Sequence, residues 1–175
     1  SSGGGTTNLP TGLQENDYVV VQTSSDNVAA GTISGWTQLK ASTTSGEGGL
    51  YAKFMGSSPD ATTTVGSEFA VVCMAFRGVD TSTPQDVTET HDYQNANGAL
   101  EPVPPPITSV TNGCAIVVSA ALDDNDIAGS IVVPAGFGDL VTSDSGSEAS
   151  TAMMAWVLLD TAGTITPGKF GSVTG

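Results

Sequence analysis

The chain carries one pattern of apolar segments and polar turns twice, and this internal repeat limits the choice of fold more than any other feature. Val-Val-Val at residues 19–21 is matched by Ile-Val-Val at residues 116–118. Gly-Trp at residues 35–36 is matched by Gly-Phe at residues 136–137. We therefore expect two structurally related halves, with the same strands in the same order in each.

The second copy ends before one segment of the first is repeated. Residues 51–55 align with residues 156–160, which pairs Tyr51 with Trp156. The first copy then has one more apolar run, residues 68–77, for which the second copy has no counterpart. A sheet that lacks a strand leaves an unpaired edge. We expect a continuation of the polypeptide to supply this strand, and a neighbouring subunit is the alternative source.

The apolar segments have the character of β-strands. They are short, rich in Val, Ile, Phe and Tyr, and separated by clusters of Gly, Ser, Thr, Asp and Pro. None shows a convincing helical stripe. We predict strands at residues 18–23, 36–40, 50–55, 68–77, 113–122, 136–142 and 151–159. Residues 68–77 and 113–122 are apolar on both faces, so we expect them to be central strands.

This pattern predicts an all-β fold with a single β-sandwich domain over residues 1–175. Each copy supplies about four strands, and strands apolar on both faces need a second sheet to cover them. We expect two diverged half-repeats that interleave into one jelly-roll or Ig-like sandwich of about eight strands. Residues 1–12 are an N-terminal arm, and residues 78–112, which hold five prolines, form the crossover between the half-repeats.

The chain is strongly acidic, with 18 Asp and Glu against 4 Lys and Arg and a net charge of −14. Nucleic-acid binding needs a basic surface, so the charge argues against a nucleic-acid partner. It also disfavours anionic membranes, and no apolar run reaches the roughly 18 residues of a membrane span. Cys73 and Cys114 are expected as reduced thiols in the core, because two cysteines do not make a disulfide scaffold.

No catalytic constellation stands out in the sequence. His91 is the one histidine, and no nucleophile elbow or paired cysteine accompanies it, so we expect a surface histidine. Carboxylate pairs for glycoside hydrolysis could be drawn from Glu47, Glu68, Glu101 and Glu148, but none of them is singled out. We predict a non-enzymatic protein without a catalytic residue or a bound cofactor.

One acidic turn allows both a structural and a functional interpretation. Asp123, Asp124 and Asp126 are a candidate Ca²⁺ site, because calcium takes several oxygen ligands from flexible loops. Their spacing does not fit an EF-hand, and a polar turn occupies the matching place in the first copy. We favour a turn with backbone-capping Asx side chains, with calcium as the alternative.

The aromatic residues also allow two interpretations. Flat aromatic side chains can stack on sugars, which makes them candidates for a carbohydrate platform. Several are equivalents in the repeat, which favours packing in the core instead. The residues concerned are Trp36, Tyr51, Tyr93 and Trp156.

Four motifs follow one another in a distinctive order in the first half of the chain. They are Leu-Pro-Thr-Gly-Leu-Gln-Glu-Asn-Asp-Tyr-Val-Val-Val at residues 9–21, Gly-Trp-Thr-Gln-Leu at residues 35–39, Tyr-Ala-Lys-Phe at residues 51–54, and Ala-Phe-Arg-Gly-Val-Asp at residues 75–80. Together they resemble a family of small β-sandwich modules common in bacteriophage virion proteins and some secreted bacterial proteins. Members of this kind are capsid-decorating, tail-fibre or spike modules without enzymatic activity.

Two basic residues within these motifs have expected structural roles. Arg77 ends an apolar run, so its guanidinium is expected to bind loop carbonyls or Asp80 and to fix the start of the crossover. Lys53 is expected to act in a similar way.

The resemblance implies a viral structural protein on the surface of a phage particle, and a capsid decoration or cement protein is the leading expectation. A tail-fibre or spike module, or a carbohydrate-binding module for host attachment, is the alternative. The expected partners are major capsid or tail proteins of the same virion, further copies of the chain in a homo-oligomer, and for attachment a host-surface glycan. An edge strand, or the N-terminal arm with Ser1, Thr6 and Asn8, could add to a neighbour's sheet.

Overall fold

The chain folds into β-structure throughout the part that the structure describes. The computed structural model describes residues 5–25, 30–41, 48–66, 70–92, 101–122, 131–145 and 150–172. Within these ranges there are thirteen strands and no helix. The strands are β1 (Gly5–Asn8), β2 (Tyr18–Ser24), β3 (Thr37–Ala41), β4 (Gly49–Phe54), β5 (Thr62–Val65), β6 (Ala70–Phe76), β7 (Ile107–Thr108), β8 (Cys114–Leu122), β9 (Ile131–Val132), β10 (Gly138–Asp144), β11 (Thr151–Leu159), β12 (Thr164–Ile165) and β13 (Gly171–Ser172).

The seven predicted strands are all present, as β2, β3, β4, β6, β8, β10 and β11. The expected total of about eight is too low, because short strands of two to four residues add to it. Strands this short carry too few residues to show an alternating pattern. They are β1, β5, β7, β9, β12 and β13.

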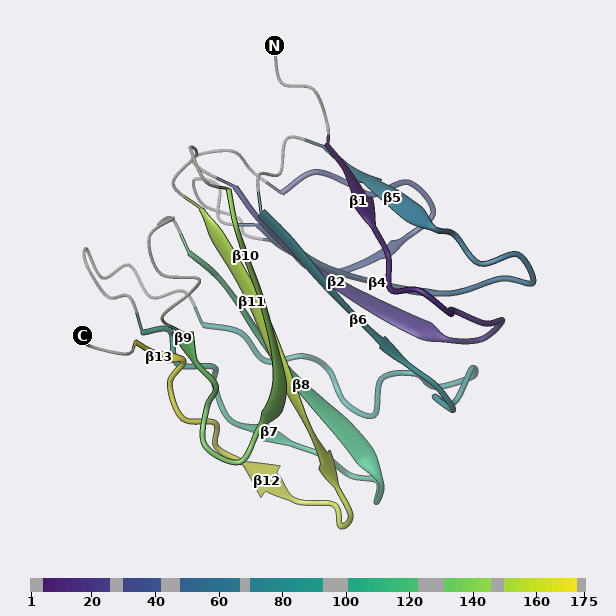
Figure 1. The fold of residues 1–175 in the computed structure, drawn as a ribbon. Coiled ribbons are helices and arrows are strands. Elements are labelled where there is room, and N and C mark those ends of the chain that lie inside the picture. The colour runs from purple at the N-terminus through teal and green to yellow at the C-terminus, as the bar shows by residue number, and fades with distance from the viewer. Residues whose placement is uncertain are drawn as a thin grey trace.

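Two larger antiparallel sheets carry the repeat. The first sheet has the order β3-β4-β2-β6, and the second sheet has the order β10-β11-β8. Figure 1 shows them side by side, the first in purple to teal and the second in green. Strands β2, β4 and β3 thus correspond to β8, β11 and β10, and β6 is the member that the second sheet lacks among the described strands.

The repeat extends to the local geometry of the turns. Trp36 donates its backbone N–H to the carbonyl of Ile33 at 3.1 Å, and Phe137 donates to Pro134 at 3.0 Å. In both turns a glycine with φ of 79° or 86° precedes the aromatic residue. The equivalence of these two positions, expected from the sequence, is therefore confirmed.

A second pair of equivalent turns leads into β2 and β8. Asn16 donates its backbone N–H to the carbonyl of Met55, and Gly113 donates to Leu159, both at 2.9 Å. Asn16 has φ of 67° and Gly113 has φ of 77°, so both occupy the left-handed region. Asn and Gly are the residues that tolerate this conformation best.

The two sheets pack against each other through a shared apolar layer, which we call the inter-sheet cluster. Alternate residues of each strand point into it, as the two-residue period of a strand requires. Ser119 on β8 also donates its hydroxyl to the side-chain carbonyl of Gln22 on β2, at 2.8 Å. The buried members of the cluster are Val20, Ala52, Ala70, Val72, Met74, Ala152 and Met154.

Each sheet has a second apolar layer on its outer face. The paired strands β1 and β5 cover the first sheet, and the pairs β7-β12 and β9-β13 lie with the second. The first outer cluster contains Leu9, Val19, Val21, Ile33, Tyr51, Met55 and Val65. The second outer cluster contains Ile116, Val118, Phe137, Met153, Ala155 and Phe170. Both large sheets thus have an apolar cluster on each face.

Two expectations about strand arrangement are wrong. The copies do not interleave, because every described sheet takes its strands from one half of the chain. Among the described strands, β6 and β8 are not central, because each lies at the edge of its sheet. Their apolar character on both faces reflects the layers above and below them, and such layers can cover an edge strand as well as a central one.

The alignment of Tyr51 with Trp156 is also wrong, by one residue. Val20 pairs with Ala52, and its equivalent Val117 pairs with Trp156. Tyr51 therefore lies in the first outer cluster, whereas Trp156 packs against the inter-sheet cluster. A slip of one residue moves a strand side chain to the opposite face of its sheet.

Candidate functional site

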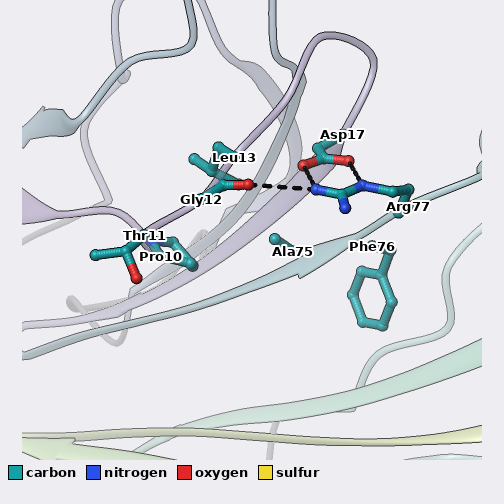
Figure 2. A pocket seen from close by; sticks show the side chains of 8 residues that line it. All are labelled: Pro10, Thr11, Gly12, Leu13, Asp17, Ala75, Phe76 and Arg77. Carbon is teal, nitrogen blue, oxygen red and sulfur yellow. Dashed lines mark hydrogen bonds and ion pairs between the residues drawn. The ribbon is translucent and has the colours of Figure 1, made fainter.

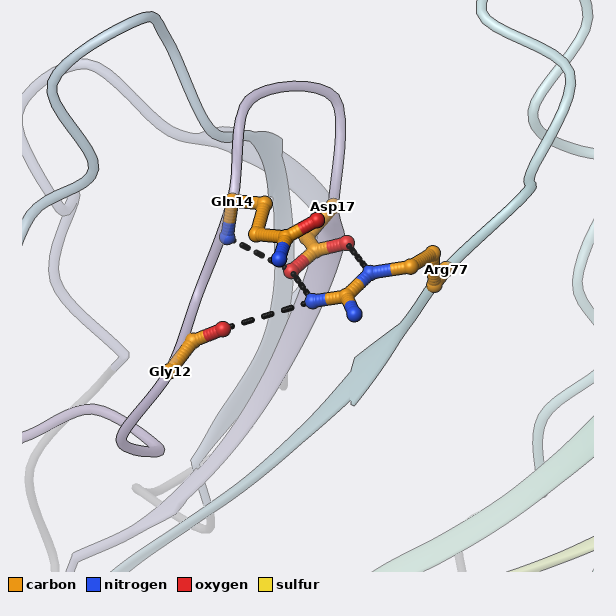
Figure 3. A network of polar contacts seen from close by, with 4 residues as sticks. All are labelled: Gly12, Gln14, Asp17 and Arg77. Carbon is orange, nitrogen blue, oxygen red and sulfur yellow. Dashed lines mark hydrogen bonds and ion pairs between the residues drawn. The ribbon is translucent and has the colours of Figure 1, made fainter.

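The most extensive polar site joins the loop before β2 to the end of β6. Leu9 anchors the start of this loop in the first outer cluster, and its N–H binds the carbonyl of Ala61 at 2.9 Å. Gly12, with φ of 78°, turns the chain back toward β2. Asp17 at the end of the loop then faces Arg77, which directly follows β6 (Figure 3).

Arg77 and Asp17 form a two-pronged ion pair. The Nε of Arg77 donates to Oδ1 of Asp17 and its Nη2 donates to Oδ2, both at 2.8 Å. The same Nη2 also donates to the carbonyl of Gly12 at 3.3 Å, and the backbone N–H of Gln14 donates to Oδ2 of Asp17 at 2.8 Å. Paired bonds of this kind fix both partners in orientation as well as distance. We call this arrangement of Arg77, Asp17, Gly12 and Gln14 the clasp.

The clasp holds its carboxylate ionised. The hydrogen bond from Arg77, followed by the backbone bond from Gln14, lowers the pKa of Asp17 from its ordinary value of 3.8 to about 2. The Asp17 side chain is 4% exposed and that of Arg77 is 60% exposed, so the carboxylate lies under the guanidinium. A carboxylate with such a pKa does not serve as a general acid near neutral pH.

A small pocket lies beside the clasp, and Figure 2 shows the residues around it. Its volume is about 170 Å³, below the roughly 300–1,000 Å³ of typical small-molecule sites. Its lining residues are Pro10, Thr11, Gly12, Leu13, Asp17, Ala75, Phe76 and Arg77. The arrangement fits a structural lock between β2 and β6 better than a ligand site.

Of the two partners expected for Arg77, the loop carbonyl is confirmed. A loop carbonyl, that of Gly12, does bind the guanidinium, but Asp80 does not. Asp80 instead accepts hydrogen bonds from the N–H and hydroxyl of Ser82 and from the hydroxyl of Thr83. These bonds, the Ser82 hydroxyl first, lower the pKa of Asp80 to about 2.

Asp17 is the residue of the clasp that was not predicted from the sequence. It lies sixty positions before Arg77 in the chain. The one indication in the sequence is that Asp17 and Arg77 both lie in distinctive motifs, at residues 9–21 and 75–80.

The crossover is tied to the start of β8 by another carboxylate. Asp86 accepts hydrogen bonds from the backbone N–H groups of Val110 at 2.6 Å and Thr111 at 3.3 Å. The Thr111 side chain, and then these backbone bonds, lower the pKa of Asp86. Asp86 thus fixes the path of the chain from one sheet to the other.

The two paired lysines make ordinary surface ion pairs. Lys53 on β4 contacts Asp60 at 2.5 Å, and Lys169 contacts Glu101 at 2.6 Å. Lys53 therefore has a structural partner. Glu101, a candidate for carboxylate catalysis, is occupied by Lys169, and the other candidates Glu47, Glu68 and Glu148 lie outside the described residues.

The metal and histidine candidates do not form a described site. Asp123, Asp124 and Asp126 lie outside the described residues. Within the ranges that are described, no group of three or more His, Cys, Asp or Glu side chains is placed to hold a metal ion. His91 is exposed, as expected of a surface histidine.

The three candidate aromatic side chains that the structure describes pack into two different clusters. Tyr51 is 1% exposed in the first outer cluster, and Trp36 packs partly buried against that cluster. Trp156 packs against the inter-sheet cluster, with its ring 5.6 Å from that of Phe76, and its Nε1 donates to Asp139 at 2.7 Å. Tyr93 lies outside the described residues. These positions agree with the expected packing role.

The N-terminal arm and the cysteines also have definite places. Thr6 and Asn8 lie in β1, where they pair with Thr64 and Thr62 of β5, and Ser1 lies outside the described residues. Both cysteines are free and partly buried. Cys73 packs against the first outer cluster.

Comparisons with known proteins give no family for the chain. No protein-family model, no curated protein and no solved structure matches it. Among the described residues there is no helix long and apolar enough to cross a membrane.

Proposed function

We propose that the chain is a non-enzymatic structural module on the outside of a bacteriophage particle, where it decorates the capsid. Its partner would be a major capsid protein of the same particle. Within this proposal the two facing sheets form one β-sandwich domain. The short strand pairs pack on its outer faces.

The observation that carries the proposal is the use of the motif residues. Two of the four segments that resemble phage virion modules, residues 9–21 and 75–80, meet at the clasp. The other two supply Trp36 and Tyr51 to the first outer cluster. The residues of these motifs thus stabilise the fold, which supports a structural role.

The carboxylates support the same proposal. Asp17, Asp80 and Asp86 all have lowered pKa values, because hydrogen bonds stabilise their ionised forms. General acid catalysis by a carboxyl group needs the opposite shift. These residues are suited to fixing loops and turns.

The test is to locate the chain in the particle of the phage whose genome encodes it. We expect mass spectrometry of purified particles to find the chain, and cryo-microscopy to place it on the outer capsid surface. Density at the tail instead would replace capsid decoration with a tail-fibre or spike role. Absence of the chain from purified particles would overturn the proposal.

A further inference from the structure

The outer edge of β8 is the place where the two halves of the molecule differ most. Its equivalent β2 lies between β4 and β6. Strand β8 pairs with β11 along its whole length, and no described strand pairs with its other edge. Strand β13, the described strand that follows β12, pairs with β9 and not with β8.

The burial of equivalent residues follows this difference. Six of the seven residues of β2 are buried, whereas only Ile116 and Val118 are buried among the nine residues of β8. Near the strand ends, Thr23 and Ser24 are 0% exposed. Their β8 equivalents Ala120 and Ala121 are only partly buried. The lack of a neighbour among the described strands along this edge of β8 accounts for the difference.

The inner faces of the two sheets also differ in burial at equivalent positions of β11 and β4. Strand β6 packs across the inter-sheet layer onto β10 and β11, and Ala70, Val72 and Met74 are at most 8% exposed there. Met154 on β11 is consequently fully buried. Its equivalent on β4 is Leu50, because Gln22 pairs with Leu50 as Ser119 pairs with Met154. Leu50 is only partly buried.

We propose that this edge of β8, along which no described strand pairs, accepts an added antiparallel strand from a different protein. The added strand would hydrogen-bond to β8 as β6 does to β2, and alternate side chains would cover the inner face of β3 and β4. Strand addition at a sheet edge is a common mode of peptide recognition. It would give the capsid partner of the proposed function a defined binding site, although its test does not depend on a virus.

The chemistry of the added strand follows from β6. Residues Ala70–Phe76 have the sequence Ala-Val-Val-Cys-Met-Ala-Phe, with no charged side chain. The partner segment is therefore an extended run of about seven uncharged, mainly aliphatic residues. A second copy of this chain is a poorer partner, because each copy carries a net charge of −14 and like charges oppose association.

The probe is a synthetic peptide with the β6 sequence, in which Cys73 is replaced by Ser and two lysines are added at each end for solubility. It is added to the intact 175-residue chain, and amide hydrogen exchange is followed residue by residue. We expect exchange to slow about tenfold at alternate amides of β8, because every second N–H of an edge strand points outward. Slowing confined to β3 or β10, or no binding at millimolar peptide, would overturn the proposal.

Matched controls distinguish pairing at the β8 edge from nonspecific binding of the peptide. A peptide with Asp in place of Val72 should lose binding, since that side chain would point into the apolar layer. In the protein, Ala115→Lys places a charge on an exposed, inward-facing position of β8 and should weaken binding about tenfold. Thr62→Lys on exposed β5 should leave binding unchanged.

Two further outcomes count against the proposal. If the free protein already dimerises and its β8 amides are protected without peptide, the occupant is a second copy. If the peptide instead displaces β6, the changes appear on β2. The peptide experiment does not depend on phage particles. Failure of the protein to bind particles would overturn capsid decoration but not strand addition at β8, so the two proposals can fail separately.

Discussion

At the scale of single residues, hydrogen bonds to three carboxylates stabilise several of the described loops. Asp17 accepts hydrogen bonds from Arg77, Asp80 accepts them from Ser82, and Asp86 accepts them from the backbone at Val110. Only one of the three, Asp17, binds a charged partner, and it joins the entry of β2 to the exit of β6. We therefore expect the clasp to contribute to the acid sensitivity of the first sheet, alongside Asp80, whose pKa is lowered to a similar value.

Asp17→Asn should reduce the loss of stability in acid. The folded pKa of about 2 lies below the ordinary 3.8, so the stabilisation by Asp17 is complete above about pH 4 and is lost as the pH falls through 2. Denaturant unfolding from pH 5 to pH 2 should show a smaller decline for the variant than for the original chain. Asp60→Asn, at an exposed ion pair, is the control, and parallel curves for the original chain and Asp17→Asn would contradict the assignment.

Gly113→Ala should destabilise the fold through backbone conformation alone. Gly113 has φ of 77°, and a Cβ there would meet no atom within 4 Å. Forcing an L-residue into the left-handed region costs about 1–2 kcal/mol. Gly163→Ala is the matched control, because a Cβ there is equally free and its φ is not positive. Equal unfolding free energies for the two variants would show that the turn does not impose this conformation.

At the scale of elements, β8 lacks a neighbour that its equivalent β2 has among the described strands, and equivalent residues in the two sheets differ in burial. Met154→Ala should cost about 2–5 kcal/mol, because it opens a cavity in a layer that β6 closes. Leu50→Ala, at the equivalent position on β4, should cost less than half as much, since Leu50 is already partly exposed. Urea unfolding of both variants measures the difference. A larger loss for Leu50→Ala would mean that something else covers the inner face of β4.

The elements also show what the sequence could and could not predict. Long runs such as β6 and β8 were located because an apolar stretch of seven to nine residues is a strong signal. The order of strands was not accessible, since burial of both faces does not distinguish an edge from a centre. Trp156 was misplaced by one residue, because the sequence alone shows no ladder to fix the register.

The candidate site was predicted only in part for a similar reason. Arg77 was identified as structural from its place after an apolar run. Its main partner Asp17 could not be deduced, because contacts between residues sixty positions apart depend on which strands become neighbours. Pairing of β2 with β6 brings Tyr18 opposite Phe76 and so places Asp17 beside Arg77.

At the scale of the whole molecule, the inter-sheet cluster ties the two halves together. It takes buried residues from both sheets, so unfolding of either sheet would expose the inner face of the other. Exposed apolar surface of that extent is unfavourable. The two copies should therefore unfold as one unit, although their strands do not mix.

The two tryptophans allow a direct test of this coupling. Trp36 reports on the first outer cluster and Trp156 on the inter-sheet cluster. Trp156→Phe leaves Trp36 as the one fluorophore of this kind, and Trp36→Phe leaves Trp156. Within each variant, the unfolding midpoint by tryptophan fluorescence should coincide with the midpoint by far-ultraviolet circular dichroism, as a two-state transition requires. If Trp36 instead reports a transition separate from the loss of strand signal, the first sheet unfolds on its own, and the shared cluster contributes less to stability than its burial implies.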